Sequence, residues 1–205
     1  MGQAGMAEAA VRYLRSVRTA APEPVEPLPR PELRCVGADE RAPLDAREFR
    51  RVLGNFATGV AVITAPPASD GGSPAGFACQ SFTSLSLDPP LVAFMVGRTS
   101  TTWPHIARAG VFCVNVLAAD QGELCRAFAV SGADKFAGVA YDAAPVSGAP
   151  RLSGAVAWID CTIHAVHTGG DHLIVVGRVH TLGTGTTPDG PLLFHQGRFT
   201  RLSPS

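Results

Sequence analysis

The stretch "TGGDHLIVVGRV", residues 168–179, places a glycine turn, an acid and a histidine directly before a strand too apolar to face water. Its glycines favour a tight turn, and its Leu, Ile and Val residues favour a buried β-strand. Asp171 and His172 stand where the turn meets the strand. Three further histidines lie nearby, namely His164, His167 and His180. The stretch is compatible with a metal site, a steadied catalytic base or a contact to a bound cofactor.

Outward from this stretch, the apolar runs are short and rich in β-branched residues. They cover residues 59–65, 90–97, 111–117, 155–167, 172–182 and 191–202, with Gly, Pro and Asp turns between them. Six or seven such strands predict a mainly β domain, either a barrel or a sandwich. Two helices are predicted between strands, at 101–110, where Pro104 suits a first turn, and at 119–129.

The folded domain is expected to begin near Leu44, with a helix over residues 44–56. Asp45 is its predicted N-cap and Glu48 follows three residues later, while the apolar residues that follow share one face. This helix is expected to pack on the edge of the domain. Residues 1–43 are predicted to be an N-terminal extension. They hold a short helix or a frayed tail at 6–18, and then a proline-rich linker that cannot join a helix or a sheet. Residues 44–205 are expected to form one domain.

Composition limits the partners and the compartment. The 17 acidic and 17 basic residues balance, so no nucleic acid partner is expected. The five cysteines are scattered without a C-x-x-C pair, which argues against disulfides and a thiolate zinc site. No apolar run reaches the roughly 20 residues of a membrane span, and no secretion signal is present, so a cytoplasmic protein is expected. The charged fraction of only 17% is typical of a protein that associates with itself.

The segment "GRTSTTW", residues 97–103, follows a predicted buried strand and opens a predicted helix. Its hydroxyls and first-turn amides can converge on one anion, which makes it a candidate phosphate cradle. The alternative is that one hydroxyl caps the helix while the others face solvent.

The segment "GFACQSFTSLSLDPPL", residues 76–91, alternates small and polar side chains in an extended run. Small side chains let a flat ligand approach the backbone, and free amides can then bind the polar edge of that ligand. The alternative is an edge strand with one hydroxyl-rich face.

Several motifs occur together in the order "FATGVAVIT", "GFACQSFTSLSLDPPLV", "STTWPHIARAGVFCVNVL", "DKFAGVAYDAAPVSGAPRL", "AWIDCTIHAVHTGGDHLIVVGRV" and "PLLFHQGRF". In this order they resemble the flavin reductase domain family over about residues 46–202. The resemblance is greatest to the reductase components of actinobacterial two-component flavin-dependent monooxygenases.

The resemblance implies a Greek-key split β-barrel that binds FMN or FAD, forms a homodimer, oxidises NADH or NADPH, and delivers reduced flavin to a monooxygenase component. The flavin-binding residues that it implies are Ala78, Cys79, Gln80, Ser81, Ser84, Phe94, Met95, Val96, Thr99, Ser100 and Thr101. The nicotinamide-side residues that it implies are His172, Asp171, Phe136 and His195. Ala78 and Gln80 stand where many relatives carry Thr and Asn or Ser, and His195 stands where an aromatic residue is common.

With a four-residue turn at 168–171, His167 and His172 become hairpin neighbours, whereas His164 and His180 have the opposite parity. Four histidines so arranged do not converge on one metal ion, so no metal site is expected. His172, oriented by Asp171, is instead expected to act in catalysis by positioning the dinucleotide beside the flavin. Two other functions stay open at this point. One is a flavin store or sensor without turnover, and the other is an interaction protein that acts through its N-terminal arm.

Overall fold

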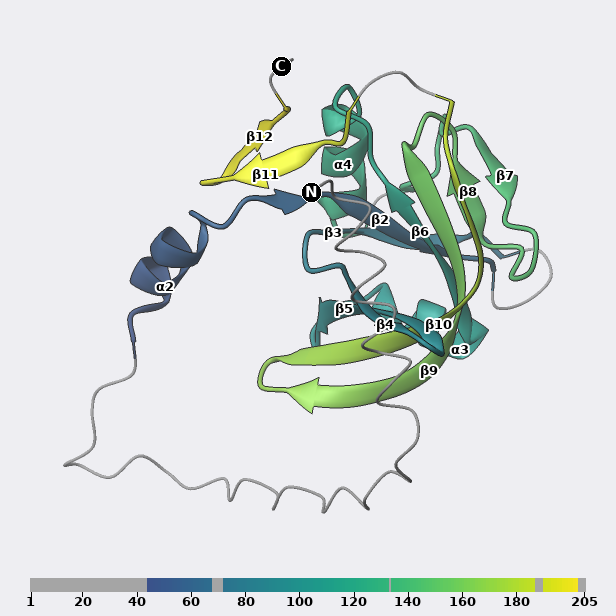
Figure 1. The fold of residues 1–205 in the computed structure, drawn as a ribbon, viewed down its shortest axis with the longest axis horizontal. Coiled ribbons are helices and arrows are strands. Elements are labelled where there is room, and N and C mark those ends of the chain that lie inside the picture. The colour runs from purple at the N-terminus through teal and green to yellow at the C-terminus, as the bar shows by residue number, and fades with distance from the viewer. Residues whose placement is uncertain (1–43, 68–71, 133, 187–189, 203–205) are drawn as a thin grey trace, which may run out of the picture. The chain divides into compact units, whose positions relative to one another are not determined.

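The computed structural model describes residues 44–67, 72–132, 134–186 and 190–202 (Figure 1). The expectations for a helix at 6–18 and for a proline-rich linker therefore lie outside the described residues.

Seven antiparallel strands form the main sheet of the domain (Figure 1). In spatial order they are β3 (Ala75–Cys79), β2 (Ala61–Ala65), β6 (Val111–Val116), β9 (Ala157–Gly169), β10 (His172–Thr184), β5 (Pro90–Gly97) and β4 (Thr83–Leu87). Several neighbours in this order are far apart in sequence, so the chain crosses between strands instead of forming a simple meander. The expected mainly β fold with a few short helices is confirmed.

The main sheet curls around an apolar cluster that contains Phe94 and Phe112. Phe77 lies on β3, at one end of the strand order, and Phe94 lies on β5, next to the other end, yet their ring centroids are 5.9 Å apart. Phe94 also packs edge-on against Phe112 of β6, with 5.2 Å between the centroids, and both rings are fully buried. The edge strands β3 and β4 do not pair with each other among the described strands. The result is a barrel left open along one side, in agreement with the expected split barrel.

Two smaller sheets complete the β-structure. The first joins β1 (Thr58–Gly59), β11 (Leu193–His195) and β12 (Arg198–Thr200), and the second pairs β7 (Tyr141–Ala143) with β8 (Pro150–Leu152). The run 191–202 is thus a hairpin and not one strand, because Gln196 and Gly197 adopt φ values of 47° and 78° and reverse the chain. Strands β7 and β8 were not anticipated from the sequence.

Three helices are described, and two of them pack on the sheet. In α3 (Trp103–Ala109), Trp103 and Ile106 are buried, and in α4 (Gly122–Ala129), Cys125 and Phe128 are buried. Both helices follow the sequence prediction closely.

The helix α2 (Ala46–Leu53) behaves differently. Asp45 caps it as expected, since its Oδ1 accepts a hydrogen bond of 3.0 Å from the Arg47 amide. Glu48 binds the Arg51 side chain instead of returning to the cap. None of the residues of α2 is buried, and Phe49, Val52 and Leu53 are each more than half exposed. The expectation that α2 packs on the edge of its own domain is therefore wrong.

The hairpin between β9 and β10 has a tighter turn than the sequence predicted. His172 pairs with Gly169, so the turn is Gly170-Asp171 alone, with Gly170 at φ 67°. His167 lies opposite Ile174 and is not the direct neighbour of His172. A residue free to adopt positive φ makes so short a turn possible, which corrects the predicted four-residue turn at 168–171.

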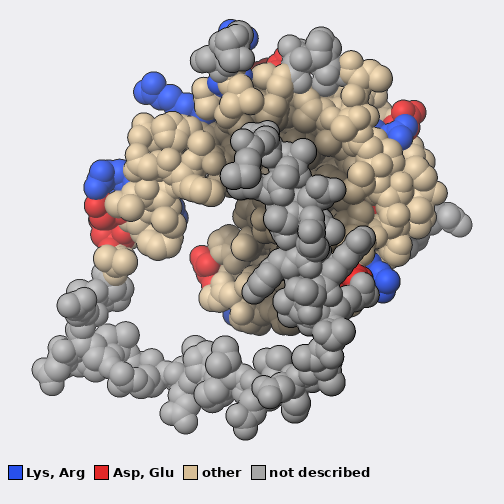
Figure 2. All heavy atoms as spheres, viewed as in Figure 1, with Lys and Arg blue, Asp and Glu red and all other residues tan. Residues whose placement is uncertain are grey.

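Charged side chains are sparse and scattered on the face drawn in Figure 2, and most of its described surface is formed by uncharged residues. No helix in the described ranges combines the length and hydropathy needed to cross a membrane.

Candidate functional site

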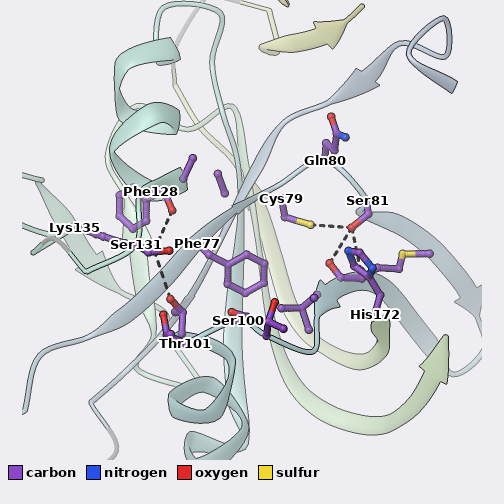
Figure 3. A pocket seen from close by; sticks show the side chains of 17 residues that line it. Phe77, Cys79, Gln80, Ser81, Ser100, Thr101, Phe128, Ser131, Lys135 and His172 are labelled. Carbon is purple, nitrogen blue, oxygen red and sulfur yellow. Dashed lines mark hydrogen bonds between the residues drawn. The ribbon is translucent and has the colours of Figure 1, made fainter. Parts of the chain in front are cut away.

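A pocket of about 530 Å³ opens on the surface of the barrel, lined by strands β3 and β5, the segment that follows β5, and the end of α4 (Figure 3). Its lining residues are Phe77, Ala78, Cys79, Gln80, Ser81, Met95, Val96, Gly97, Thr99, Ser100, Thr101, Thr102, Phe128, Ala129, Ser131, Lys135 and His172. The pocket is elongated, and Figure 3 shows His172 and Lys135 toward its two opposite ends.

Most of the residues predicted for the site meet in this pocket. They are Ala78, Cys79, Gln80, Ser81, Met95, Val96, Thr99, Ser100, Thr101 and His172. Five do not line it. Phe94 points into the core, Ser84 lies on the edge strand β4, and Asp171 stands behind His172. Phe136 lines an adjoining pocket, and His195 lines a separate hollow at the β11–β12 hairpin.

The His172 end of the pocket is held in place by the hairpin turn. The Nδ1 atom of His172 lies 2.7 Å from Oδ1 of Asp171, and the backbone oxygen of Asp171 accepts a 3.0 Å hydrogen bond from the Arg98 amide. The carboxylate of Asp171 accepts a hydrogen bond from Nδ1 of His172, and this bond lowers the pKa of Asp171. His172 pairs across the strands with Gly97, whose missing side chain leaves room beside the ring. The imidazole is therefore oriented and half exposed at the pocket rim.

The wall between β3 and β5 is tied together by one hydroxyl group. Ser81 Oγ accepts a 3.0 Å hydrogen bond from the Met95 amide and donates one of 3.0 Å to the Met95 carbonyl. Cys79 Sγ lies 3.3 Å from the same hydroxyl, and burial raises the pKa of this thiol. A thiol with a raised pKa is a poor nucleophile, so Cys79 contributes a small neutral surface and not a reactive group.

The opposite end of the pocket carries hydroxyls and one ammonium group. Ser100 Oγ accepts a 3.2 Å hydrogen bond from the Trp103 amide, so this hydroxyl caps the first turn of α3. Thr99, Thr101 and Thr102 also line the pocket here. Lys135 Nζ donates to the carbonyls of Gly76 and Phe128, each at 3.1 Å, and its pKa is lowered by burial. This end of the pocket is suited to an anion.

Sequence reasoning included Phe77 in the segment 76–91 and Gly97 and Thr102 in the segment 97–103, but it missed Phe128, Ala129, Ser131 and Lys135 as lining residues. Lys135 carried a usable signal, because it stands between Asp134 and Phe136 in the "DKF" motif and an ammonium group is a common phosphate ligand. Phe128, Ala129 and Ser131 come from the end of α4 and the residues just after it, and only the fold brings them to the pocket.

The histidines near the hairpin do not gather around a common centre. His180 Nε2 lies 3.0 Å from the Thr162 hydroxyl, and a β-bulge at His164 interrupts the pairing of β9 with β10. Within the ranges that the structure covers, no group of three or more His, Cys, Asp or Glu residues is placed to hold a metal ion.

The pocket has small and aromatic side chains along its length, and hydroxyls with an ammonium group at one end, a lining that suits a ligand with a flat ring and an anionic group. Residues 53–203 match the model of the flavin reductase like domain. The chain therefore belongs to the flavin reductase family.

Two proteins with sequences similar to this chain are named as reductases. The chain is 48% identical over 168 residues to the HsaB reductase subunit of a flavin-dependent monooxygenase from Rhodococcus jostii, covering 82% of this chain and 84% of that protein. It is 40% identical over 166 residues to an NADH-dependent FAD reductase of Streptomyces globisporus, covering 79% of this chain and 88% of that protein.

Two solved structures of related proteins are similar to this chain in fold and sequence. Nitrilotriacetate monooxygenase component B from Mycobacterium thermoresistibile has a TM-score of 0.72 at 46% identity, over 77% of this chain and 87% of that one. The NADH:FAD oxidoreductase of Streptomyces globisporus, solved in complex with NAD and FAD fragments, has a TM-score of 0.73 at 40% identity, over 82% and 98% of the two chains.

Proposed function

We propose that this protein is an NAD(P)H-dependent flavin oxidoreductase that supplies reduced FMN or FAD to a separate flavin-dependent monooxygenase. Its similarity to reductase subunits of two-component monooxygenases supports this function. The observation that carries the proposal is the arrangement of the pocket, in which His172, held by Asp171, stands at one end of the cavity that bears the hydroxyls and Lys135 at the other.

The residues of the pocket fit a flavin. Ala78 and Cys79 present small side chains along β3, so the flat ring can approach the backbone of that strand. The hydroxyls of Thr99 and Thr101 can donate to the flavin phosphate, and Lys135 adds a positive charge at the same end. Met95 and Val96 are proposed to flank the ring from β5.

When bound, the flavin supplies the redox chemistry because it accepts a hydride from the nicotinamide. No side chain of this protein can take that role. The protein supplies geometry. Asp171 accepts a hydrogen bond from Nδ1 of His172, so the ring keeps one orientation and its Nε2 atom is left for the dinucleotide. Holding the two reactants in contact turns an encounter of two molecules into an effectively unimolecular transfer.

A non-catalytic flavin store is the second candidate. The same pocket would hold the flavin, but a store has no use for an oriented imidazole at the pocket rim. The position of His172 therefore favours the reductase.

We further propose that the protein acts as a homodimer. The apolar face of α2, formed by Phe49, Val52 and Leu53, has no partner within the described chain. A second copy is the partner that this face fits, because exposed apolar clusters of this kind are typical of association surfaces. His195 does not line the pocket of its own chain, so its proposed contact with the nicotinamide requires the second copy.

A cytoplasmic location is proposed on two grounds. Reduced nicotinamide is an intracellular co-substrate, and the four described cysteines are free thiols, as is usual in a reducing compartment.

The function is tested by following NADH and NADPH oxidation by the purified protein with no flavin and with riboflavin, FMN or FAD. We expect oxidation only when flavin is present. Adding an oxygenase component of the family should couple this oxidation to hydroxylation of the oxygenase substrate. Flavin binding without any nicotinamide oxidation would instead support the flavin store.

A further inference from the structure

The hairpin formed by β7 and β8 lies outside the main sheet, and none of its strand residues lines the proposed flavin pocket (Figure 1). Three polar side chains bind it to the main sheet, each of them fully buried and each from a different strand, namely Thr64, Asn115 and Asp160. Thr64 Oγ1 donates to the Pro150 carbonyl at 2.5 Å, and Asn115 Nδ2 donates to the same carbonyl at 3.2 Å. Asn115 Oδ1 in turn accepts a 2.7 Å hydrogen bond from the Leu152 amide. Strand β8 is therefore fixed to β2 and β6.

The turn of this hairpin is held by a buried carboxylate. Asp160 Oδ2 accepts hydrogen bonds from the amides of Val146 and Ser147, at 2.8 and 3.1 Å. Buried hydrogen bonds of this kind favour one arrangement of the backbone, because other arrangements would leave the groups unpaired. Tyr141 stands on β7 opposite Leu152, so the hairpin fixes the backbone that carries this ring.

Three aromatic rings connect the hairpin to the flavin pocket. The ring of Tyr141 packs edge-on against Phe136, with 5.6 Å between the centroids and 77° between the planes. Phe136 packs edge-on against Phe128 in the same way, at 5.0 Å and 86°. Phe128 is fully buried and lines the flavin pocket. The ring of Phe136 thus lies between a buried ring and the fixed hairpin, and edge-to-face pairs of this geometry are favourable.

Lys135 directly precedes Phe136 and brings its ammonium group to the pocket. This group donates to the carbonyls of Gly76 and Phe128, each at 3.1 Å. Within the part of the chain that the structure describes, no ion pair includes Lys135. A lysine side chain is long and flexible, so its location depends on the backbone that carries it. That backbone is held by the packing of Phe136.

We propose that Tyr141 is a positioning residue that keeps Lys135 at the flavin phosphate by packing against Phe136. This role rests on the proposed function, because it assumes that Lys135 faces the phosphate of a bound flavin. Tyr141 lines neither the flavin pocket nor the adjoining pocket that Phe136 lines, so it acts on the phosphate only through its neighbours. Its ring carries this role, since its hydroxyl makes no hydrogen bond among the described residues.

The experiment measures equilibrium binding of FMN and riboflavin to the flavin-free full chain by fluorescence titration. The ratio of the riboflavin Kd to the FMN Kd reports what the phosphate contributes to binding. Tyr141→Ala should lower this ratio about threefold or more, as expected for the loss of one edge-to-face ring pair, and leave riboflavin affinity unchanged. Tyr141→Phe keeps the ring and should retain the ratio. The matched control is Val146→Ala, an exposed apolar residue in the turn of the same hairpin, and it should also retain the ratio.

A double-mutant cycle separates positioning from a general loss of stability. Lys135→Met should itself lower the ratio. Adding Tyr141→Ala to Lys135→Met should lower it no further, because the residue that Tyr141 positions is gone. Independent, additive losses would overturn the proposal. So would an equal loss of FMN and riboflavin affinity in Tyr141→Ala, or an unaltered ratio in either single variant.

Oxidation of NADH by the unsubstituted protein in the presence of FMN keeps this test separate from that of the proposed function. If only the positioning role fails, flavin-dependent oxidation remains intact. If the proposed function fails, no flavin supports oxidation, whereas the binding ratios still decide the role of Tyr141.

Discussion

The Nδ1 atom of His172 lies 2.7 Å from Oδ1 of Asp171, at the tip of the hairpin beside one end of the proposed flavin pocket. The hydrogen bond from His172 lowers the pKa of Asp171, and through the same bond the carboxylate orients the ring at Nδ1. The other ring nitrogen is then available to a ligand at the rim of the pocket.

His172→Ala should raise the KM for NADH or slow hydride transfer while flavin affinity changes little. If the imidazole makes one or two hydrogen bonds to the dinucleotide, its loss should cost about 1–3 kcal/mol in kcat/KM. Steady-state kinetics beside flavin titration check this. The control is His180→Ala, because the ring of His180 lies beside the Thr162 hydroxyl and does not line the pocket.

Unaltered nicotinamide kinetics in His172→Ala would show that Asp171 and His172 form an ordinary turn. Inhibition of the unsubstituted enzyme by a chelator would indicate a metal site.

Thr101→Val should weaken FMN about tenfold or more and leave riboflavin unchanged, because the lost hydroxyl is proposed to bind only the phosphate, and a hydrogen bond to a charged group is worth about 1.5–3 kcal/mol. Ser100 is a poorer choice, because its hydroxyl also caps the Trp103 amide and its removal would disturb α3. Fluorescence titration with both flavins measures the difference. Thr184→Val at the far end of β10 serves as the control. Equal weakening of riboflavin and FMN would place the phosphate elsewhere.

Val52→Glu on α2 should lower the dimer affinity strongly, since it puts a charge in the middle of the proposed apolar contact. Sedimentation analysis over a range of protein concentrations detects this change. Arg47→Glu alters charge on the same exposed helix away from the apolar residues, and it should leave the association intact. A parent protein that is monomeric at every concentration would remove the homodimer, and with it the proposed role of His195.

Deletion of residues 1–43 should leave flavin reduction largely intact. The described strands and the pocket all lie within residues 44–202, and a proline-rich arm contributes little buried apolar area. Activity and thermal unfolding of the truncated chain check this expectation. Loss of folding or of association on truncation would show that the arm has a structural role.

The sequence predicted the parts of the fold that depend on local patterns. The strand at 90–97 and the helix near Pro104 follow from apolar runs and start signals, and the "GGDH" turn marks the β9–β10 hairpin. The predicted length of this turn was wrong. Gly170 adopts a positive φ, so the chain reverses in fewer residues than predicted. The resemblance to the family supplied most of the pocket residues, but Lys135 is held at the pocket by hydrogen bonds to Phe128 of α4 and to Gly76 of β3, and Gly76 is far from it in sequence.

The exposed apolar face of α2 shows a second feature that the sequence alone did not predict. Its pattern predicts an apolar face correctly, but the pattern does not say whether the partner of that face lies in the same chain.

The most direct test of the reductase function is an anaerobic single-turnover experiment, in which the flavin-loaded protein is mixed rapidly with NADH and the flavin absorbance is followed. The proposed function predicts that the flavin is reduced by one equivalent of NADH, much faster than free flavin under the same conditions, and that the reduced flavin then passes to added oxygenase. A flavin that binds but stays oxidised, with either NADH or NADPH, would contradict the proposal.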